Sequence, residues 1–250
     1  MKNTGNIRVG IGGWVFPPWR GTFYPAGTRQ ADELAHASRH VTAIEINGTF
    51  YRTQTPASFR KWRDETPEGF VFSLKGPRFL THRSELASAA PYMQRFFDSG
   101  FLDLGDKLGP ILWQFAPTLQ FDAADFAAFL ALLPAELGGR AMRHVVEVRH
   151  PSFRVPGFFD LLRERRIAVA QVEDAKYPAF DEVTAPDFVY LRLRRCAEEE
   201  ATGYPPAALD AWAARVRDWA GDGRDVFLYF INGAKVRAPA AAQALLARLR

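Results

Sequence analysis

The chain has 250 residues, of which 48% are hydrophobic and 24% are charged, and this composition excludes extended disorder. A formal net charge of +4 is too small to indicate nucleic-acid binding unless the cations cluster. The single cysteine, Cys196, excludes an intramolecular disulfide, and no apolar run reaches the length of a signal-peptide core or a membrane span, so we expect a cytoplasmic protein with no membrane contact.

Short runs of β-branched and aromatic residues alternate with longer segments of helical spacing. This alternation is typical of parallel strands joined by helices, and eight such runs in a chain of this length favour closure into a barrel. The sequence therefore predicts an α/β fold, a single parallel eight-stranded (β/α)8 TIM barrel, with residues 1–250 as one domain. The runs, in chain order, are IRVGIGG from Ile7, TAIEI from Thr42, FVFSLK from Phe70, PILWQF from Pro110, HVVEVR from His144, IAVAQV from Ile167, DFVYLRL from Asp187 and DVFLYF from Asp225.

Helix start signals stand between these runs. Pro56 opens one helix, Asp122 caps a second, and Pro205 and Pro206 precede a third. A final helix is expected over residues 239–249. These helices supply the connections that parallel strands require.

Polar residues of the predicted strands can be assigned to the inside of the barrel, because residues two apart in a strand share a face. Glu45 lies on the face opposite to Ile44, and Glu147 on the face opposite to Val146. These polar residues fall late in their strands, which is where barrel enzymes carry their active sites. The same reasoning directs inward Asn47, Lys75, Gln114, Arg149, Asp174, Tyr190, Arg192, Arg194 and, with Phe230, Asn232.

Charged side chains inside a barrel need partners or water, because burying a lone charge is costly. One interpretation is an ion network in which the acidic and basic side chains neutralise one another and do no chemistry. The other is a pocket in which Lys75, Arg149 and Arg192 bind an anionic group while Glu45 or Glu147 transfers a proton. Arginine favours the second interpretation, because its planar fork matches carboxylate and phosphate oxygens.

Other residues offer further chemistry. His82 and His150 are expected at the rim, where either could shuttle a proton or simply cap a loop. Lys75 could form a Schiff base, but a lysine beside acids and arginines is more simply an anion-binding charge. The sequence requires no cofactor. A divalent metal could use the two histidines with Glu147 and Asp174, yet these residues lack the tight spacing of metal ligands, so no metal site is assigned.

Four stretches of the chain are read together: GIGGWVFPPWRGTFYP from Gly10, residues 45–86, WQFAPTLQFD from Trp113 and VEVRHPSF from Val146. They resemble the domain-of-unknown-function 72 family, also called YecE-like. The resemblance implies a (β/α)8 barrel with a cavity at the strand ends, and it implies no established reaction. The positions that match the family's motifs are Trp14, Trp19, Tyr24, Glu45, Asn47, Phe50, Tyr51, Lys75, Thr81, His82, Gln114, Glu147, Arg149, His150, Tyr190 and Arg192.

The last third of the chain departs from that pattern. Arg194 and Arg195 stand where the family usually shows His-Gly, and Ile231 and Asn232 stand where it shows an Asn-Asn pair. The role that these positions have in relatives is therefore not transferred to this chain.

Three functions follow from these observations. The first is an enzyme that binds a small phosphate or carboxylate in the pocket. The second is nucleic-acid binding or processing, in which Trp14 and Tyr51 stack on bases beside a basic mouth that includes Arg194, although such aromatic residues more commonly pack loops. The third is a non-catalytic ligand-binding barrel. Residues expected to complete the small-anion site are Asn47, Tyr51, Gln114, Tyr190, Asn232 and Trp14.

Overall fold

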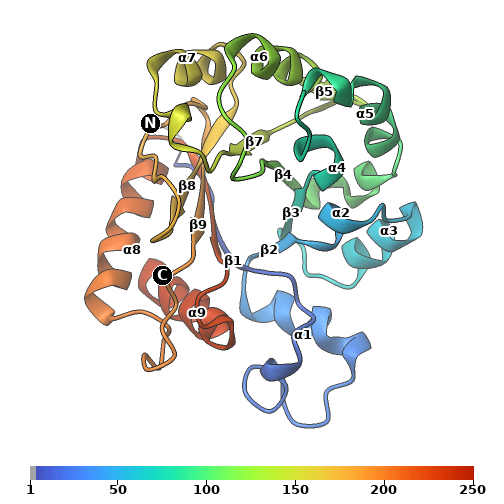
Figure 1. Cartoon of the computed structure of the whole chain (residues 1–250). Coiled ribbons are helices and arrows are strands. Elements are labelled where there is room, and N and C mark those ends of the chain that lie inside the picture. The colour runs from blue at the N-terminus through green and yellow to red at the C-terminus, as the bar shows by residue number, and fades with distance from the viewer. Residues whose placement is uncertain (1–3) are drawn as a thin grey trace.

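The computed structural model describes residues 4–250, which contain a closed barrel of parallel strands surrounded by helices (Figure 1). Each of the eight predicted strands is present, so the predicted (β/α)8 fold is confirmed. The strands of the barrel are β1 Ile7–Gly12, β2 Ala43–Ile46, β3 Val71–Lys75, β4 Leu108–Gln114, β7 His144–Glu147, β8 Ala168–Glu173, β9 Phe188–Leu193 and β10 Asp225–Phe230.

The strands follow one another around the barrel in chain order, and β1 pairs with both β2 and β10. Parallel register brings the carboxyl ends of all the strands to one end of the barrel. Gly12 is paired with Glu45, and Gln114 is paired with Glu147. Polar residues late in different strands are thereby brought to the same level.

Helices cover the outside of the barrel, and several begin where the sequence predicted. Pro56 is the first residue of α3, the side chain of Asp122 accepts a hydrogen bond from the backbone N–H of Asp125 at 2.9 Å, and α8 begins at Pro206. Within residues 4–250, no helix combines the length and the apolar character needed to cross a membrane. The α-helices are α1 Glu33–His40, α2 Gly48–Tyr51, α3 Pro56–Asp64, α4 Arg78–Thr81, α5 Ala90–Phe97, α6 Ala123–Ala131, α7 Pro156–Glu164, α8 Pro206–Gly221 and α9 Ala238–Leu249.

Shorter elements lie in the connections. A hairpin between α6 and β7, which the sequence analysis missed, turns through Gly138 and Gly139, whose φ angles of 58° and 75° are typical of a tight hairpin turn. Its two strands are β5 Glu136–Leu137 and β6 Arg140–Ala141. The 3-10 helices are η1 Pro17–Trp19, η2 Gln30–Asp32, η3 Ala87–Ala89, η4 Phe101–Lys107, η5 Pro151–Phe153 and η6 Lys235–Arg237.

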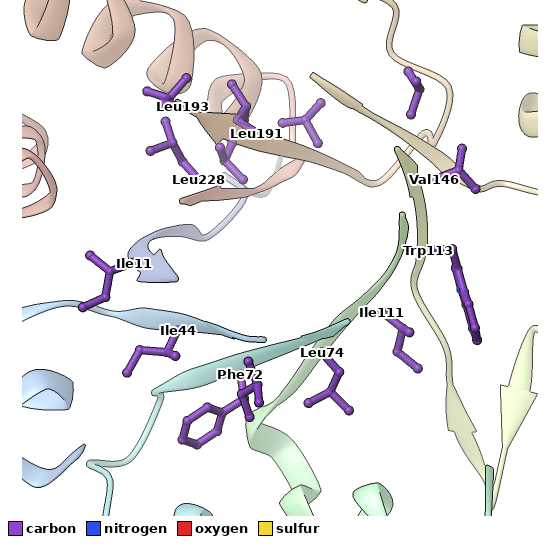
Figure 2. Close-up of a cluster of buried hydrophobic side chains, with 14 of the residues drawn as sticks. Ile11, Ile44, Phe72, Leu74, Ile111, Trp113, Val146, Leu191, Leu193 and Leu228 are labelled. Carbon is purple, nitrogen blue, oxygen red and sulfur yellow. The ribbon is translucent and has the colours of Figure 1, made fainter. Parts of the chain in front are cut away.

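Two apolar cores stabilise the barrel. The larger core lies between strands and helices, and Figure 2 shows its members, such as Ile44, Phe72 and Val146, on the outer side of the strands. A smaller core fills the lumen and includes Ala43 and Leu112. Because each of these two residues precedes a polar lumen residue of its strand by two positions, the lumen is apolar below and polar toward the carboxyl ends.

The prediction of which residues of the eighth strand face the lumen was wrong. Phe230 belongs to the core between strands and helices, whereas Tyr229 and Ile231 belong to the core of the lumen. The strand ends at Phe230, and Asn232 is exposed with a left-handed φ of 65°. Asn232 therefore belongs to the turn that follows the strand, and its polarity does not identify the lumen face.

Candidate functional site

The carboxyl ends of the strands bring together charged and polar side chains that are far apart in the sequence. We call this group the central cluster, and most of it is almost completely buried. Strands β2, β3, β4, β7 and β9 position its members, with Arg149 in the turn after β7. The central cluster consists of Glu45, Lys75, Gln114, Glu147, Arg149, Tyr190 and Arg192, all of which the sequence predicted to face one another.

Arg192 connects the two glutamates. Its Nε donates to Oε2 of Glu45 at 2.9 Å, and its Nη2 donates to Oε1 of Glu45 at 3.0 Å, which is a bidentate arrangement. Its Nη1 donates to Oε2 of Glu147. The O–H of Tyr190 adds a hydrogen bond of 2.7 Å to Oε2 of Glu45. The guanidinium is therefore fixed between the carboxylates.

Glu147 accepts hydrogen bonds from three side chains. Besides Arg192, the Nε2 of Gln114 donates to its Oε1 at 3.0 Å, and the Nε of Arg149 donates to the same oxygen at 2.8 Å. Burial alone would raise the pKa of Glu147, but the positive charges of Arg192 and Arg149 outweigh burial and lower this pKa to about 2. Glu147 is consequently ionised at neutral pH and is a weak proton acceptor.

Among residues 4–250, Lys75 is the cation of the central cluster that forms no ion pair with a carboxylate. Its side chain is buried, with the residue only 5% exposed, and its Nζ donates to Oε1 of Gln114 at 3.0 Å. The Nζ lies 4.0 Å from the ring centroid of Phe50. Within residues 4–250, no carboxylate oxygen lies within ion-pair distance of this nitrogen. Burial, followed by repulsion from Arg192, lowers the pKa of Lys75 to about 8.

The main chain holds Lys75 and its aromatic neighbour together. The hydroxyl of Thr49 donates to the backbone carbonyl of Lys75 at 2.7 Å, which ties α2 to the end of β3. Phe50 is the next residue of α2 and is buried. The hydroxyl of Thr49 therefore links the backbone of Lys75 to the helix that carries the ring of Phe50.

A second ion pair lies beside the central cluster. Nη1 of Arg194 lies 2.8 Å from Oδ2 of Asp174, and both side chains are largely buried. The ring of Tyr177 lies 4.7 Å from the guanidinium carbon of Arg149 and 5.7 Å from that of Arg194. Sequence reasoning missed Tyr177, because it lies in an irregular segment after β8 where no periodicity indicates the direction of a side chain.

The predicted rim residues occupy different surroundings. Nδ1 of His150 accepts a hydrogen bond from the backbone N–H of Ser152 at 3.2 Å, so this imidazole caps η5. His82 lies with its ring 5.5 Å from that of Phe50, and burial, followed by Arg78, lowers its pKa. His82 follows the last residue of α4, and its ring shares Phe50 as a neighbour with the ammonium of Lys75.

Further predicted residues lie outside the central cluster. Tyr51 is 71% exposed, at the end of α2. Trp14 and Asn47 line a separate cavity of about 300 Å³ at the carboxyl ends of β1 and β2. Another cavity, of about 520 Å³, is lined by His82 and by residues that follow β4. Neither of these two cavities includes Lys75 or Arg149 in its lining.

The described residues do not assemble a metal site. Within residues 4–250, no group of three or more His, Cys, Asp or Glu side chains is placed so that it could hold a metal ion. The set considered from the sequence, His82, His150, Glu147 and Asp174, is therefore not gathered around one point.

Comparison with known proteins gives one consistent result. The sequence matches the family described as "Protein of unknown function DUF72" over residues 8–250. It is 29% identical over 154 residues to the UPF0759 protein YecE of Escherichia coli strain K12, a match that covers 60% of this chain and 51% of YecE. It is 27% identical over 160 residues to the UPF0759 protein YunF of Bacillus subtilis strain 168, covering 62% of this chain and 54% of YunF. The matched region thus spans about half the length of these relatives.

A solved structure supports the same fold. A DUF72 family protein from Thermotoga maritima superimposes with a TM-score of 0.75 at 20% sequence identity, and the superposition covers 96% of this chain and 97% of that protein. At this level of identity the likeness concerns the fold and does not transfer a function.

Proposed function

This chain belongs to the DUF72 family, and we propose that it is an enzyme that binds a small anionic substrate, a phosphate or a carboxylate, at the central cluster. Lys75 and Arg149 would bind the anion, and Arg192 would neutralise the carboxylates of Glu45 and Glu147. Membership of the family does not identify a reaction, so the proposal depends on the geometry of the central cluster. A cytoplasmic location remains part of the same proposal.

The observation that carries the proposal is the buried ammonium of Lys75, which has no carboxylate partner within the described residues 4–250. Three cations, Lys75, Arg149 and Arg192, share the central cluster with two carboxylates, those of Glu45 and Glu147. A buried charge without a counterion is costly, and the lowered pKa of Lys75 reports this cost. A bound anion would supply the missing negative charge and the hydrogen-bond acceptors that an ammonium requires.

Proton transfer was assigned from the sequence to Glu45 or Glu147, and the geometry favours Lys75 instead. Both carboxylates accept hydrogen bonds from Arg192, and the low pKa of Glu147 makes it a weak base. A group with a pKa of about 8 exchanges its proton much more readily near neutral pH. We therefore assign to the glutamates the positioning of Arg192 and Arg149. We assign to Lys75 both the charge that binds the anion and the proton that is transferred.

The proposal predicts a pH dependence for anion affinity. Sulfate is a suitable probe, because it keeps its charge between about pH 6 and 10. Since the anion binds the protonated lysine, its affinity should be constant below the pKa of about 8 of Lys75 and should fall by up to about tenfold per pH unit above it. Isothermal titration calorimetry at several pH values measures this. An affinity that does not change from pH 7 to 10 would contradict the assignment of Lys75.

Single-stranded nucleic acid is the second candidate ligand, and exposed aromatic side chains near the same end favour it. Tyr51 is 71% exposed and Phe79 is 40% exposed, and both follow barrel strands. Arg52 and Arg78 are exposed next to them. Arg194, which the sequence analysis placed in this basic mouth, is instead largely buried against Asp174.

The nucleic-acid candidate predicts a steep salt dependence. Binding of a short single-stranded oligonucleotide should weaken strongly between low and moderate salt. Arg78→Ala should reduce the steepness of the plot of log affinity against log salt by about one unit, because one fewer counterion is released. Tyr51→Ala should weaken binding by about 1–3 kcal/mol if its ring stacks on a base. Fluorescence anisotropy at several salt concentrations measures both. Absence of binding at low salt excludes this candidate.

A further inference from the structure

The cavity lined by Trp14 and Asn47 lies at the same end of the barrel as the central cluster but is lined by different side chains. It has a volume of about 300 Å³ and opens where β1 and β2 end. Glu45 is followed in sequence by Ile46 and Asn47, which line the cavity, so one strand contributes to both places. This volume lies at the lower end of the range for small-molecule sites.

Two tryptophans form one corner of this cavity. Trp14 follows β1, and Trp62 lies on α3. Their rings meet edge to face, with 5.2 Å between the centroids and an angle of 76° between the planes. Both tryptophans are half-buried and line the cavity, and aromatic rings in such a position favour stacking or edge-to-face contact with a flat ligand.

The polar lining of the cavity is cationic and amidic, with no acidic side chain among the lining residues. Lys235 and Arg52 supply the positive charges, and Asn47 and Gln54 supply amide donors and acceptors. Within residues 4–250, neither Lys235 nor Arg52 forms an ion pair with a carboxylate. The charges of the cavity are thus available to an anion.

Lys235 is held over two aromatic rings. Its Nζ lies 4.7 Å from the ring centroid of Phe16 and 5.4 Å from that of Trp19. The indole N–H of Trp19 donates to the backbone carbonyl of Lys235 at 2.9 Å, which fixes the start of η6 against the loop that follows β1. Burial lowers the pKa of Lys235, as expected for an ammonium without a counterion.

From these contacts we infer that the cavity is a second binding site, for a flat aromatic ring that carries a phosphate or a carboxylate. The ring would stack at the corner formed by Trp14 and Trp62, and the anionic group would meet Lys235 and Arg52. Asn47 and Gln54 would recognise polar atoms on the edge of the ring. Aromatic stacking combined with charge-assisted hydrogen bonds distinguishes this ligand class from the small anion proposed for the central cluster.

Two probes represent the two sources of this chemistry. Adenosine monophosphate represents the nucleotides, and indole-3-acetate represents the aromatic carboxylic acids. Calorimetric titration of the full chain should show binding of at least one of them, whereas adenosine, which lacks the anion, should bind at least about tenfold more weakly than adenosine monophosphate if the nucleotide is the ligand. If neither adenosine monophosphate nor indole-3-acetate binds at millimolar concentration, the inference is wrong.

Variants then locate the bound probe. Lys235→Met and Arg52→Ala should each weaken binding of the probe by about tenfold or more, because each removes a charge-assisted hydrogen bond. Lys61→Ala is the matched control, since this exposed lysine precedes Trp62 on α3 and does not line the cavity. The control should bind the probe as the wild type does. Equal weakening by Lys61→Ala would show a general effect of charge and would overturn the inference.

A last variant separates this site from the central cluster. Lys75→Met should leave the affinity for adenosine monophosphate or indole-3-acetate within about twofold of the wild type, because Lys75 does not line the cavity. If Lys75→Met abolishes binding of the probe and Lys235→Met does not, the aromatic anion occupies the central cluster and the second site is refuted. Failure of sulfate to bind at the central cluster would leave the result for the second cavity unaffected.

Discussion

Replacing Lys75 by methionine is expected to weaken binding of sulfate strongly while leaving the ligand-free protein at least as stable as the wild type. Affinity should fall because a charge-assisted hydrogen bond to an anion contributes about 1.5–3 kcal/mol, which corresponds to a fall of about 10-fold to 150-fold. Methionine has nearly the length of lysine and keeps an apolar contact with the ring of Phe50, which lies 4.0 Å from the ammonium. The change therefore removes the charge and leaves little empty space.

The effect of Lys75→Met on stability follows from the shifted pKa. The pKa of Lys75 falls from 10.5 to about 8 in the folded protein, so folding disfavours the charged form by about 3 kcal/mol below pH 8. Between pH 8 and 10.5 the unfolded chain binds more protons than the folded protein, and wild-type stability should rise with pH on account of this group. The advantage of the methionine variant should thus be largest below pH 8 and should shrink as the pH rises through that window.

Urea denaturation at pH 7 and at pH 10, with and without sulfate, measures both parts of this prediction. Lys61→Met is the control, because Lys61 is an exposed lysine whose nearest carboxylate oxygen, on Glu65, lies 3.6 Å away. The control should keep the stabilisation by sulfate and show little change in the free energy of unfolding. A Lys75→Met protein that is still stabilised by sulfate as strongly as the wild type would show that the ammonium does not bind the anion.

The arrangement of the barrel could be predicted from the sequence because it depends on repeating local patterns. Alternation along β2 directed Glu45 inward, and alternation along β9 directed Tyr190 and Arg192 inward, as the structure confirms. Closure of a parallel barrel then brings the carboxyl ends of distant strands to one level. No knowledge of individual contacts was required for this step.

The pairing of charges could not be predicted, because it depends on side-chain torsions and on distances across the lumen. The sequence allowed Lys75 to pair with either glutamate, whereas in the structure both carboxylates bind Arg192 and the lysine ammonium donates to the amide of Gln114. This outcome makes the unpaired ammonium the feature that carries the proposed function. The position of the Tyr177 ring over Arg149 could likewise not be predicted, because Tyr177 lies in an irregular segment.

Residues near strand ends were the second source of error. Asn232 follows the last residue of β10, so its position depends on the turn and not on strand alternation. Asn47 was grouped with the cluster by strand alternation and Trp14 by the motifs of the family it resembles, and both line a cavity whose lining does not include Lys75. A strand pattern thus predicts which end of the barrel a residue occupies better than it predicts the site to which that residue belongs.

Arg192→Met is expected to destabilise the folded protein by about 3–5 kcal/mol at neutral pH, because it leaves two buried carboxylates without their shared cation. Glu45 and Glu147 are each no more than 1% exposed, so water cannot replace the lost hydrogen bonds without rearrangement. Urea denaturation measures the change in the free energy of unfolding. Arg60→Met is the matched control, because Arg60 forms an exposed ion pair with Asp103, and loss of such a pair should cost less than about 1 kcal/mol.

The pH dependence of Arg192→Met distinguishes a lost ion pair from a simple loss of packing. In the wild type, the attraction of Arg192 and Arg149 lowers the pKa of Glu147 from 4.5 to about 2 despite burial, so this carboxylate stabilises the fold above pH 4.5 and loses that contribution as the pH falls toward 2. Without Arg192 the same carboxyl group takes up a proton more readily, and protonation removes the unpaired charge. The difference between wild type and variant should therefore shrink as the pH falls. Neutralising both acids in Glu45→Gln/Glu147→Gln/Arg192→Met should recover part of the lost stability at pH 7, whereas a deficit that is the same at pH 7 and pH 4 and persists in the triple variant would mean that Arg192 stabilises the barrel by packing alone.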